Sequence, residues 1–322
     1  MTGMRTMFAG PMVLPTALLL LGGIAYGSLF SANKMAIGAG FPFLAYSFWQ
    51  VLLAAAALLL LSVFTSGLPR LSIVNLRVFA LVSVAGLIGP LLVITAIADK
   101  LPPGVVTLCA ALIPAVTYIL ALTVRSDRLR WMSTAGVLLG FGSMLLIVLP
   151  RESLPVAGSW VWVVFSLLMP LSAAVNNVFG AMLRPADAGS VSMSAGMMGM
   201  AAVILFFISW ANDGLFLLTD AGPEGLWGTL WAAAAIAVTY TCFFEIIRRA
   251  GGLFFAQLNY VVVAAGLIWA WILFGESLSG WVWGAVAVLV ASLAFINAGT
   301  ARSIREREAA AAASDEGGSG AP

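Results

Sequence analysis

The sequence predicts an all-α polytopic membrane protein with ten transmembrane helices, and three observations carry that prediction. First, 62% of the 322 residues are hydrophobic and only 9% are charged, whereas a soluble domain carries about 25% charged residues. Second, the apolar residues gather in ten blocks of roughly 20 residues, the length that a helix needs to cross ~30 Å of hydrocarbon. The blocks span residues 14–35, 43–64, 79–98, 105–124, 131–149, 160–183, 191–211, 226–247, 253–274 and 281–300.

The third observation is the uneven placement of Lys and Arg between the blocks. When the connecting segments are assigned alternately to two sides, the side with both termini receives 12 of the 15 basic residues. The other side receives Lys34, Lys100 and Arg151. Because translocated loops avoid Lys and Arg, the richer side is cytoplasmic. We therefore expect a multi-pass protein of the plasma membrane (the inner membrane of a bacterium) with both termini in the cytoplasm.

The composition also excludes several classes of function. No basic face remains once the loops are assigned, so nucleic acid is not an expected partner. Cys109 and Cys242 are two lone thiols inside apolar blocks, and His is absent, so we expect no disulfide framework, no metal site and no cofactor. The chain has no P-loop and no constellation of catalytic residues, which argues against an ATPase and against an enzyme of any kind.

The chain divides into a cytoplasmic segment 1–13, two halves at 14–150 and 151–300, and a cytoplasmic, largely disordered tail at 301–322. Residues 1–21 could pass for a secretory signal, but the apolar pattern continues beyond them, so we expect them to stay as part of the first helix. The tail begins as a short helical extension and becomes rich in Ala, Gly and Ser.

The two halves show signs of an internal repeat. Pro102-Pro103-Gly104 and Gly251-Gly252 are both expected to break the chain just before an apolar block. At the same offset in sequence, Asp127 falls on Glu276. Since each half would contain an odd number of helices, five, the second half would enter the membrane inverted, a plan that recurs in secondary transporters.

Several short motifs resemble the EamA-type repeat of the drug/metabolite transporter (DMT) superfamily. The stretch Tyr26–Lys34 is similar to the opening of that repeat, and Gly275–Gly284 is similar to its closing signature. Looser likenesses are found at residues 126–136 and 240–251. The resemblance covers roughly residues 14–300 and implies ten helices in two inverted repeats that transport a small molecule, often by export. Asp127 stands where the family usually has Glu.

Two charged residues inside the apolar blocks are candidates for function, because a charge in a membrane is costly unless it is paired or hydrated. Lys34 lies toward the outer end of the first block and would either attract an anionic group of a substrate or snorkel to the headgroups. Glu245 is the candidate acid for ion coupling. Its alternative is an intrahelical ion pair, because Arg248 and Arg249 follow it at helical spacing.

Polar and aromatic side chains within the blocks extend the candidate substrate site. Amides and hydroxyls deep in a bundle either hold helices together or line a wet cavity. The predicted substrate-binding residues are Lys34, Asn33, Asn177, Gln257, Tyr260, Tyr240 and Tyr26. Trp49 and Gln50 are lesser candidates, and six Trp residues near block ends are assigned to a lipid-interface belt. They are Trp131, Trp160, Trp162, Trp227, Trp281 and Trp283.

We therefore expect a secondary transporter that moves a small metabolite, amino-acid-like compound or drug by alternating access, with export the favoured direction. Its partners would be the small-molecule substrate and the lipid bilayer. A homodimer is possible, because Gly136/Gly140 and Gly280/Gly284 have the small-xxx-small spacing of close helix contacts. The alternative is a non-transporting membrane scaffold or accessory subunit of a larger complex.

Overall fold

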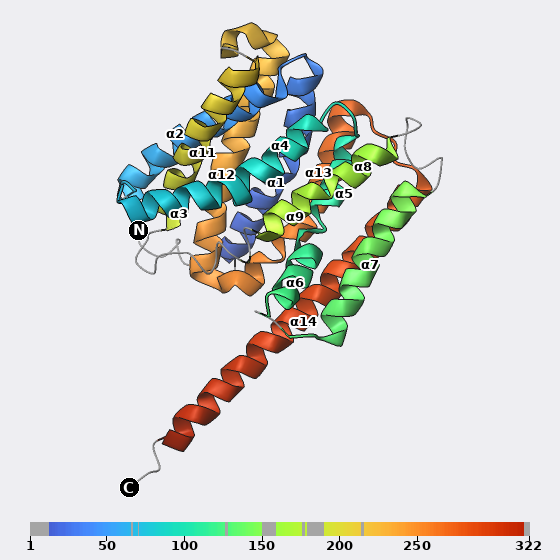
Figure 1. The fold of residues 1–322 in the computed structure, drawn as a ribbon. Helices are drawn as coiled ribbons and strands as arrows, with labels where there is room; N and C mark the ends of the chain where they lie inside the picture. The colour runs from blue at the N-terminus through green and yellow to red at the C-terminus, as the bar shows by residue number, and fades with distance from the viewer. Residues whose placement is uncertain are drawn as a thin grey trace, which may run out of the picture.

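A computed structural model describes residues 13–65, 67–69, 71–125, 128–149, 159–175, 178, 190–213 and 216–318. Every regular element within these ranges is helical (Figure 1). In the first half they are α1 Val13–Gly38, α2 Phe43–Thr65, α3 Ile73–Ser83, the π-helix η1 Val84–Ile88, α4 Gly89–Ala96, α5 Pro103–Ala110, α6 Ile113–Thr123 and α7 Trp131–Val148. In the second half they are α8 Trp160–Ser166, α9 Leu168–Val175, α11 Ser190–Asp213, the 3-10 helix η3 Leu218–Ala221, α12 Gly222–Phe255, α13 Leu258–Phe274 and α14 Gly280–Gly318.

Eight helical segments in the described residues are long and apolar enough to cross a membrane. Two shorter apolar helical segments, Trp160–Val175 and Leu258–Phe274, coincide with the sixth and ninth expected blocks. The structure therefore agrees with a polytopic membrane protein built from helices. The third span begins at Ile73, earlier than the expected 79, because the Ser72 hydroxyl caps the helix by accepting from Asn75 N–H at 3.2 Å.

Two local expectations differ from the structure. Gly251-Gly252 was expected to break the chain, but α12 continues through both glycines to Phe255, and the turn falls at Ala256 and Gln257. The prediction of a break there was wrong because a glycine inside a helix costs only about 1 kcal/mol, less than unpairing backbone groups in an apolar setting. The helical extension after Arg302 is also longer than expected, since α14 reaches Gly318.

α1 occupies the centre of the bundle, where it packs against α12 and α13. Glycines permit these contacts. A Cβ atom at Gly27 would lie 2.8 Å from the backbone nitrogen of Gly266 in α13, and one at Gly228 would lie 2.9 Å from the Ala36 Cβ. At these two positions the neighbouring helices therefore lie so close that no side chain larger than glycine fits between them. These close contacts fix the position of α1 along its axis relative to α12 and α13.

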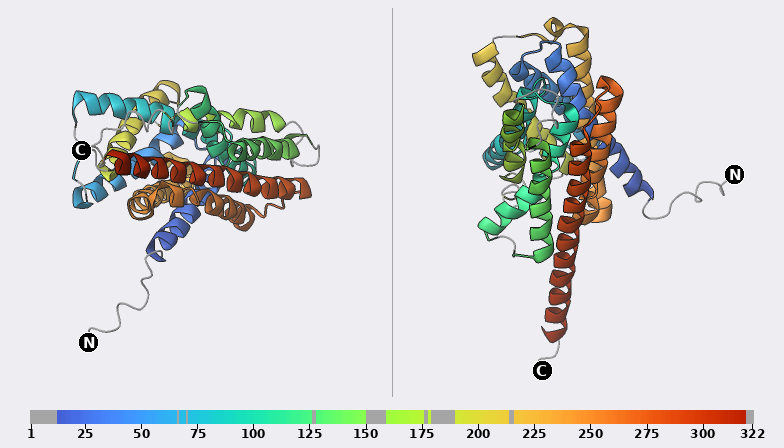
Figure 2. Two further views of the ribbon diagram at one scale, coloured as in Figure 1. Left: turned by 90° about the horizontal axis from the view of Figure 1, so that it is seen from below. Right: turned by 90° about the vertical axis from the view of Figure 1, so that its right-hand side faces the viewer.

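Two further pairs of long helices pack closely. α2 packs against α11, and α7 packs along α14. Figure 2 shows α14 running beside α7 and then extending well beyond the bundle. The Gly136/Gly140 pair serves the α7–α14 contact, since a Cβ at Gly136 would lie 2.8 Å from the Ser292 carbonyl oxygen. That small-xxx-small motif is therefore used within the chain.

Candidate functional site

An ion pair joins the two halves of the chain near the C-terminal end of α1. Lys34 Nζ donates to Glu276 Oε1 at 3.1 Å, and the two side chains are 29% and 11% exposed. Glu276 lies in the short connection between α13 and α14, where Gly275 adopts the left-handed conformation (φ 61°) that lets the chain leave α13 sharply. The Lys34 charge is thus neutralised by a carboxylate in this structure.

Two further groups hold this pair in place. Glu276 Oε2 accepts a hydrogen bond from Gly104 N–H at 3.3 Å, in the first turn of α5. The carboxylate therefore uses both oxygens and receives one of the unpaired N–H groups of a helix start. The Lys34 ammonium also lies 4.8 Å from the centroid of the Phe274 ring, within cation–π range. We call Lys34, Glu276, Gly104 and Phe274 the outer clamp, because the distribution of Lys and Arg predicts that they lie on the side away from the cytoplasm.

Beginning at Asn33, the neighbour of Lys34 in α1, buried polar side chains connect α1, α2 and α4. The Tyr46 hydroxyl donates to Asn33 Oδ1 at 2.7 Å, and both residues are buried. One residue further along α2, the Ser47 hydroxyl shares a hydrogen bond of 3.0 Å with the Thr95 hydroxyl of α4. Asn33 therefore accepts a hydrogen bond that ties α1 to α2, so at least one of its amide atoms is engaged between helices in this structure.

Gln50 continues this line by one helical turn but has no partner. It lies four residues after Tyr46 and three after Ser47, on the same face of α2. Its side chain is 0% exposed, and neither amide atom finds a hydrogen-bond partner among the described residues. Leaving a buried polar group unpaired costs about 1–3 kcal/mol.

The expected site residues of α13 lie at the other end of that helix from the outer clamp. Gln257 is exposed in the turn that precedes α13. The Tyr260 hydroxyl accepts a hydrogen bond of 3.4 Å from Asn297 Nδ2 of α14. Since 14 residues separate Tyr260 from Phe274, the two regions lie about 21 Å apart along the helix. The structure does not bring Gln257 or Tyr260 together with Lys34.

The remaining candidate residues that the structure describes lie on α1, α2 and α12. Tyr26 packs edge-on against Phe30 of α1 at 6.1 Å, and Tyr26 and Tyr240 both pack on the core formed by α1, α2, α11 and α12. Glu245 forms an i,i+4 ion pair with Arg249 on α12, which is the intrahelical alternative considered above. The Trp49 indole donates to the Phe216 carbonyl at 3.0 Å. Asn177 lies outside the described residues.

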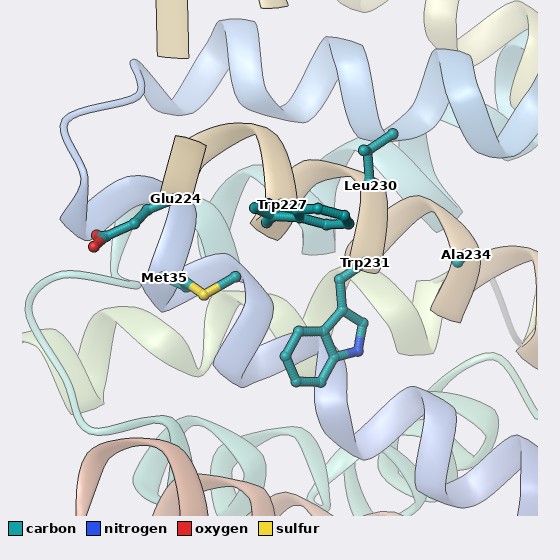
Figure 3. Close-up of a pocket in the computed structure, with 6 residues that line it drawn as sticks. All are labelled: Met35, Glu224, Trp227, Leu230, Trp231 and Ala234. Atoms are coloured by element: carbon teal, nitrogen blue, oxygen red, sulfur yellow. The ribbon is translucent and has the colours of Figure 1, made fainter. Parts of the chain in front are cut away.

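A groove of about 610 Å³ opens where α12 begins, beside the end of α1 (Figure 3). Its lining is apolar apart from the exposed carboxylate of Glu224 at one side. The lining residues are Met35, Glu224, Trp227, Leu230, Trp231 and Ala234. Trp231 is fixed by a 3.0 Å hydrogen bond from its indole to the Ser28 hydroxyl and by edge-on contact with Trp269.

The Trp residues assigned to a lipid-interface belt are all exposed in the structure, with 37–68% of each side chain accessible. No group of three or more potential metal ligands occurs among the described residues. Sequence reasoning missed Glu276 as the partner of Lys34, and it missed Tyr46, Ser47 and Thr95 altogether. A signal for Glu276 existed, because it belongs to the closing motif and lies on the same predicted side as Lys34.

Comparison with known proteins adds the family. Residues 14–149 match the model of the EamA-like transporter family. A solved structure titled "Crystal structure of protein" is 16% identical, with a TM-score of 0.61 over 89% of this chain and 96% of that chain, a likeness of fold alone. No curated protein matches the chain. Residues 14–149 are thus similar to the EamA-like transporter family, which belongs to the DMT superfamily, and this likeness together with the eight apolar helices among the described residues suggests a membrane transporter of that type.

Proposed function

We propose that the protein is a secondary transporter that moves a small metabolite, amino-acid-like compound or drug by alternating access, in the direction of export. The observation that carries the proposal is the outer clamp, in which Lys34 of the first half binds Glu276 of the second half. Alternating access needs a contact between the halves that breaks when one side opens. A partly buried ion pair is suited to this, because it is stable only while its geometry is intact.

The helix contacts support an arrangement of ten spans in two inverted repeats, 14–150 and 151–300. The eight long spans and the two shorter apolar helices together match the ten expected blocks. If each helix is exchanged for its counterpart in the other half, the contact of α1 with α13 becomes that of α9 with α6, which is observed. Likewise the contact of α2 with α12 becomes that of α11 with α3, also observed.

In the proposed orientation both termini are cytoplasmic and the outer clamp faces away from the cytoplasm. Lys34 and Glu276 are paired in this structure, and we take the described conformation to be one whose outer side is shut. Lys34 would attract an anionic group of the substrate when the clamp opens, and Asn33 would lie on the same path. The absence of an ATP-binding motif from the sequence motivates coupling to an ion gradient, with Glu245 as the candidate acid.

Tyr26 and Tyr240 are proposed to form an aromatic wall between the two ends of the path. Gln257 and Tyr260 would serve at its cytoplasmic end, because they lie beside the turn between α12 and α13. We take these positions to be separated along the membrane normal. A substrate would therefore meet them in sequence as the two sides open in turn.

The test compares untargeted metabolite profiles of cells and medium for the wild type, Lys34→Ala and an empty vector, at matched membrane abundance. We expect the wild type to displace at least one compound across the membrane and Lys34→Ala to lose most of that displacement. Equal displacement by both proteins would remove Lys34 from the transport path. Profiles identical to the empty vector would favour a scaffold or accessory subunit.

A further inference from the structure

We propose that Gln50 forms a deep binding subsite for a neutral group that carries a hydrogen-bond donor beside an acceptor, such as a carboxamide. The inference rests on the proposed transport function and names the chemical class of one part of the substrate. It starts from a buried amide on α2 whose hydrogen-bonding groups are not used by the polar pairs beside it. Gln50 is fully buried, and both its amide oxygen and its amide nitrogen lack a partner among the described residues.

The neighbouring polar side chains of α2 have hydrogen-bond partners of their own. On the same face of α2, Tyr46 is already hydrogen-bonded to Asn33 and Ser47 to Thr95. These two pairs are polar contacts of α2 with α1 and α4, and neither of them uses the Gln50 amide. Gln50 lies one helical turn further along α2 than Tyr46 and on the same face of the helix. We take this position to lie on the path of a molecule that has passed the outer clamp.

The chemistry of the subsite follows from the amide and from the absence of charge around it. A carboxamide offers one acceptor oxygen and two donor hydrogens in a plane, so it pairs best with a group that presents a donor and an acceptor side by side. α1, α4, α11 and α12 all pack against α2. The facing segments contain no Asp, Glu, Lys or Arg at residues 13–33, 43–65, 78–96, 190–212 and 225–243.

A charged group at this depth would therefore lack a counter-charge, which is costly inside a membrane. The part of the substrate that reaches Gln50 must be neutral. Any charged part would remain near the outer clamp, where Lys34 and Glu276 offer both signs. The subsite thus fits a small amphiphile with a polar head and a neutral amide-like end.

The first experiment measures thermal unfolding of purified Gln50→Leu without added substrate. Removing an unpaired buried amide should raise the melting temperature by roughly 2–4 °C. The matched control is Asn33→Leu. This change removes an amide that accepts a hydrogen bond from the Tyr46 hydroxyl, so it should lower the melting temperature. If Gln50→Leu lowers it as much as Asn33→Leu does, Gln50 has a structural partner and the proposal is overturned.

The second experiment measures uptake of radiolabelled L-asparagine and L-leucine into proteoliposomes that contain the wild type or Gln50→Leu. The two probes have the same zwitterionic head and similar shape, and differ in a carboxamide against an isopropyl group. We expect the wild type to prefer asparagine by roughly 10-fold or more, and Gln50→Leu to reduce the preference to about 2-fold or less. A wild type that carries leucine as fast as asparagine overturns the subsite alone. A wild type that carries neither counts against both the subsite and the transport of amino-acid-like compounds.

Discussion

Breaking the outer clamp should shift the protein toward an outward-open state, and the size of the shift can be estimated from the structure. For the 3.1 Å separation of Lys34 Nζ and Glu276 Oε1, the Coulomb attraction is about 5 kcal/mol at an effective dielectric constant of ~20. Desolvation and the partial exposure of Lys34 offset much of it, leaving a coupling of about 1–3 kcal/mol. That range corresponds to a change of about 5- to 150-fold in an equilibrium between two states.

The assay is the rate at which a membrane-impermeant thiol reagent modifies Ser47→Cys from outside the cell. The background carries Cys109→Ala and Cys242→Ala, which remove both natural thiols. Ser47 is fully buried in this structure, in which Lys34 and Glu276 are paired, so it should react slowly while the clamp is closed. Adding Lys34→Ala should raise the rate by about 5- to 150-fold, because opening becomes easier by the coupling energy.

The matched control is Lys100→Ala. Lys100 pairs with Asp99 at 2.6 Å on the same predicted side, but both side chains are well exposed at 43% and 37%. A surface pair of this kind contributes little, so the labelling rate should stay within about 2-fold of the background. An unchanged rate in folded Lys34→Ala protein would refute the reasoning, since the clamp would then carry no closing energy.

Three further predictions concern packing and coupling. Tyr46→Phe leaves Asn33 Oδ1 without its donor, so the protein should lose about 1–2 kcal/mol of stability, seen as a lower melting temperature in detergent. Gly27→Ala places a Cβ 2.8 Å from backbone atoms of α13 and should destabilise the protein, whereas Gly142→Ala, with nothing within 4 Å, should not; comparable melting temperatures for both variants would contradict the packing argument. If Glu245 is the coupling acid, Glu245→Gln should abolish the pH dependence of transport, and a preserved pH profile in folded protein would leave it only its ion pair.

Much of the fold could be predicted because the membrane imposes it. Apolar blocks of fixed length and the placement of Lys and Arg require no knowledge of contacts, and the structure contains a helix at each expected block. The residues at which the helices begin and end were less predictable. The break expected at Gly251-Gly252 failed because glycine costs little inside a helix whose backbone must stay hydrogen-bonded. The observed turn falls at Ala256 and Gln257, and neither residue is of a type that usually ends a helix.

The candidate site could be predicted only in part, because its residues meet across long distances in the chain. Lys34 was identified as a costly charge in an apolar block, but Glu276 lies 242 residues away and pairs with it only through the fold. Gln257 and Tyr260 were chosen because they are polar, although depth in the membrane separates them from Lys34. Gln50 ranked low because nothing in the sequence shows that Tyr46, Ser47 and their partners leave its amide unpaired.

The central claim is that this chain alone moves a small molecule across a membrane. The most direct test is flux of the compound found by metabolite profiling into proteoliposomes that contain only the purified wild-type protein. We predict saturable flux that exceeds empty liposomes and that Gln50→Leu reduces by roughly 10-fold or more. Flux equal to that of empty liposomes, with folded protein present in the bilayer, would contradict the account and leave the accessory-subunit alternative.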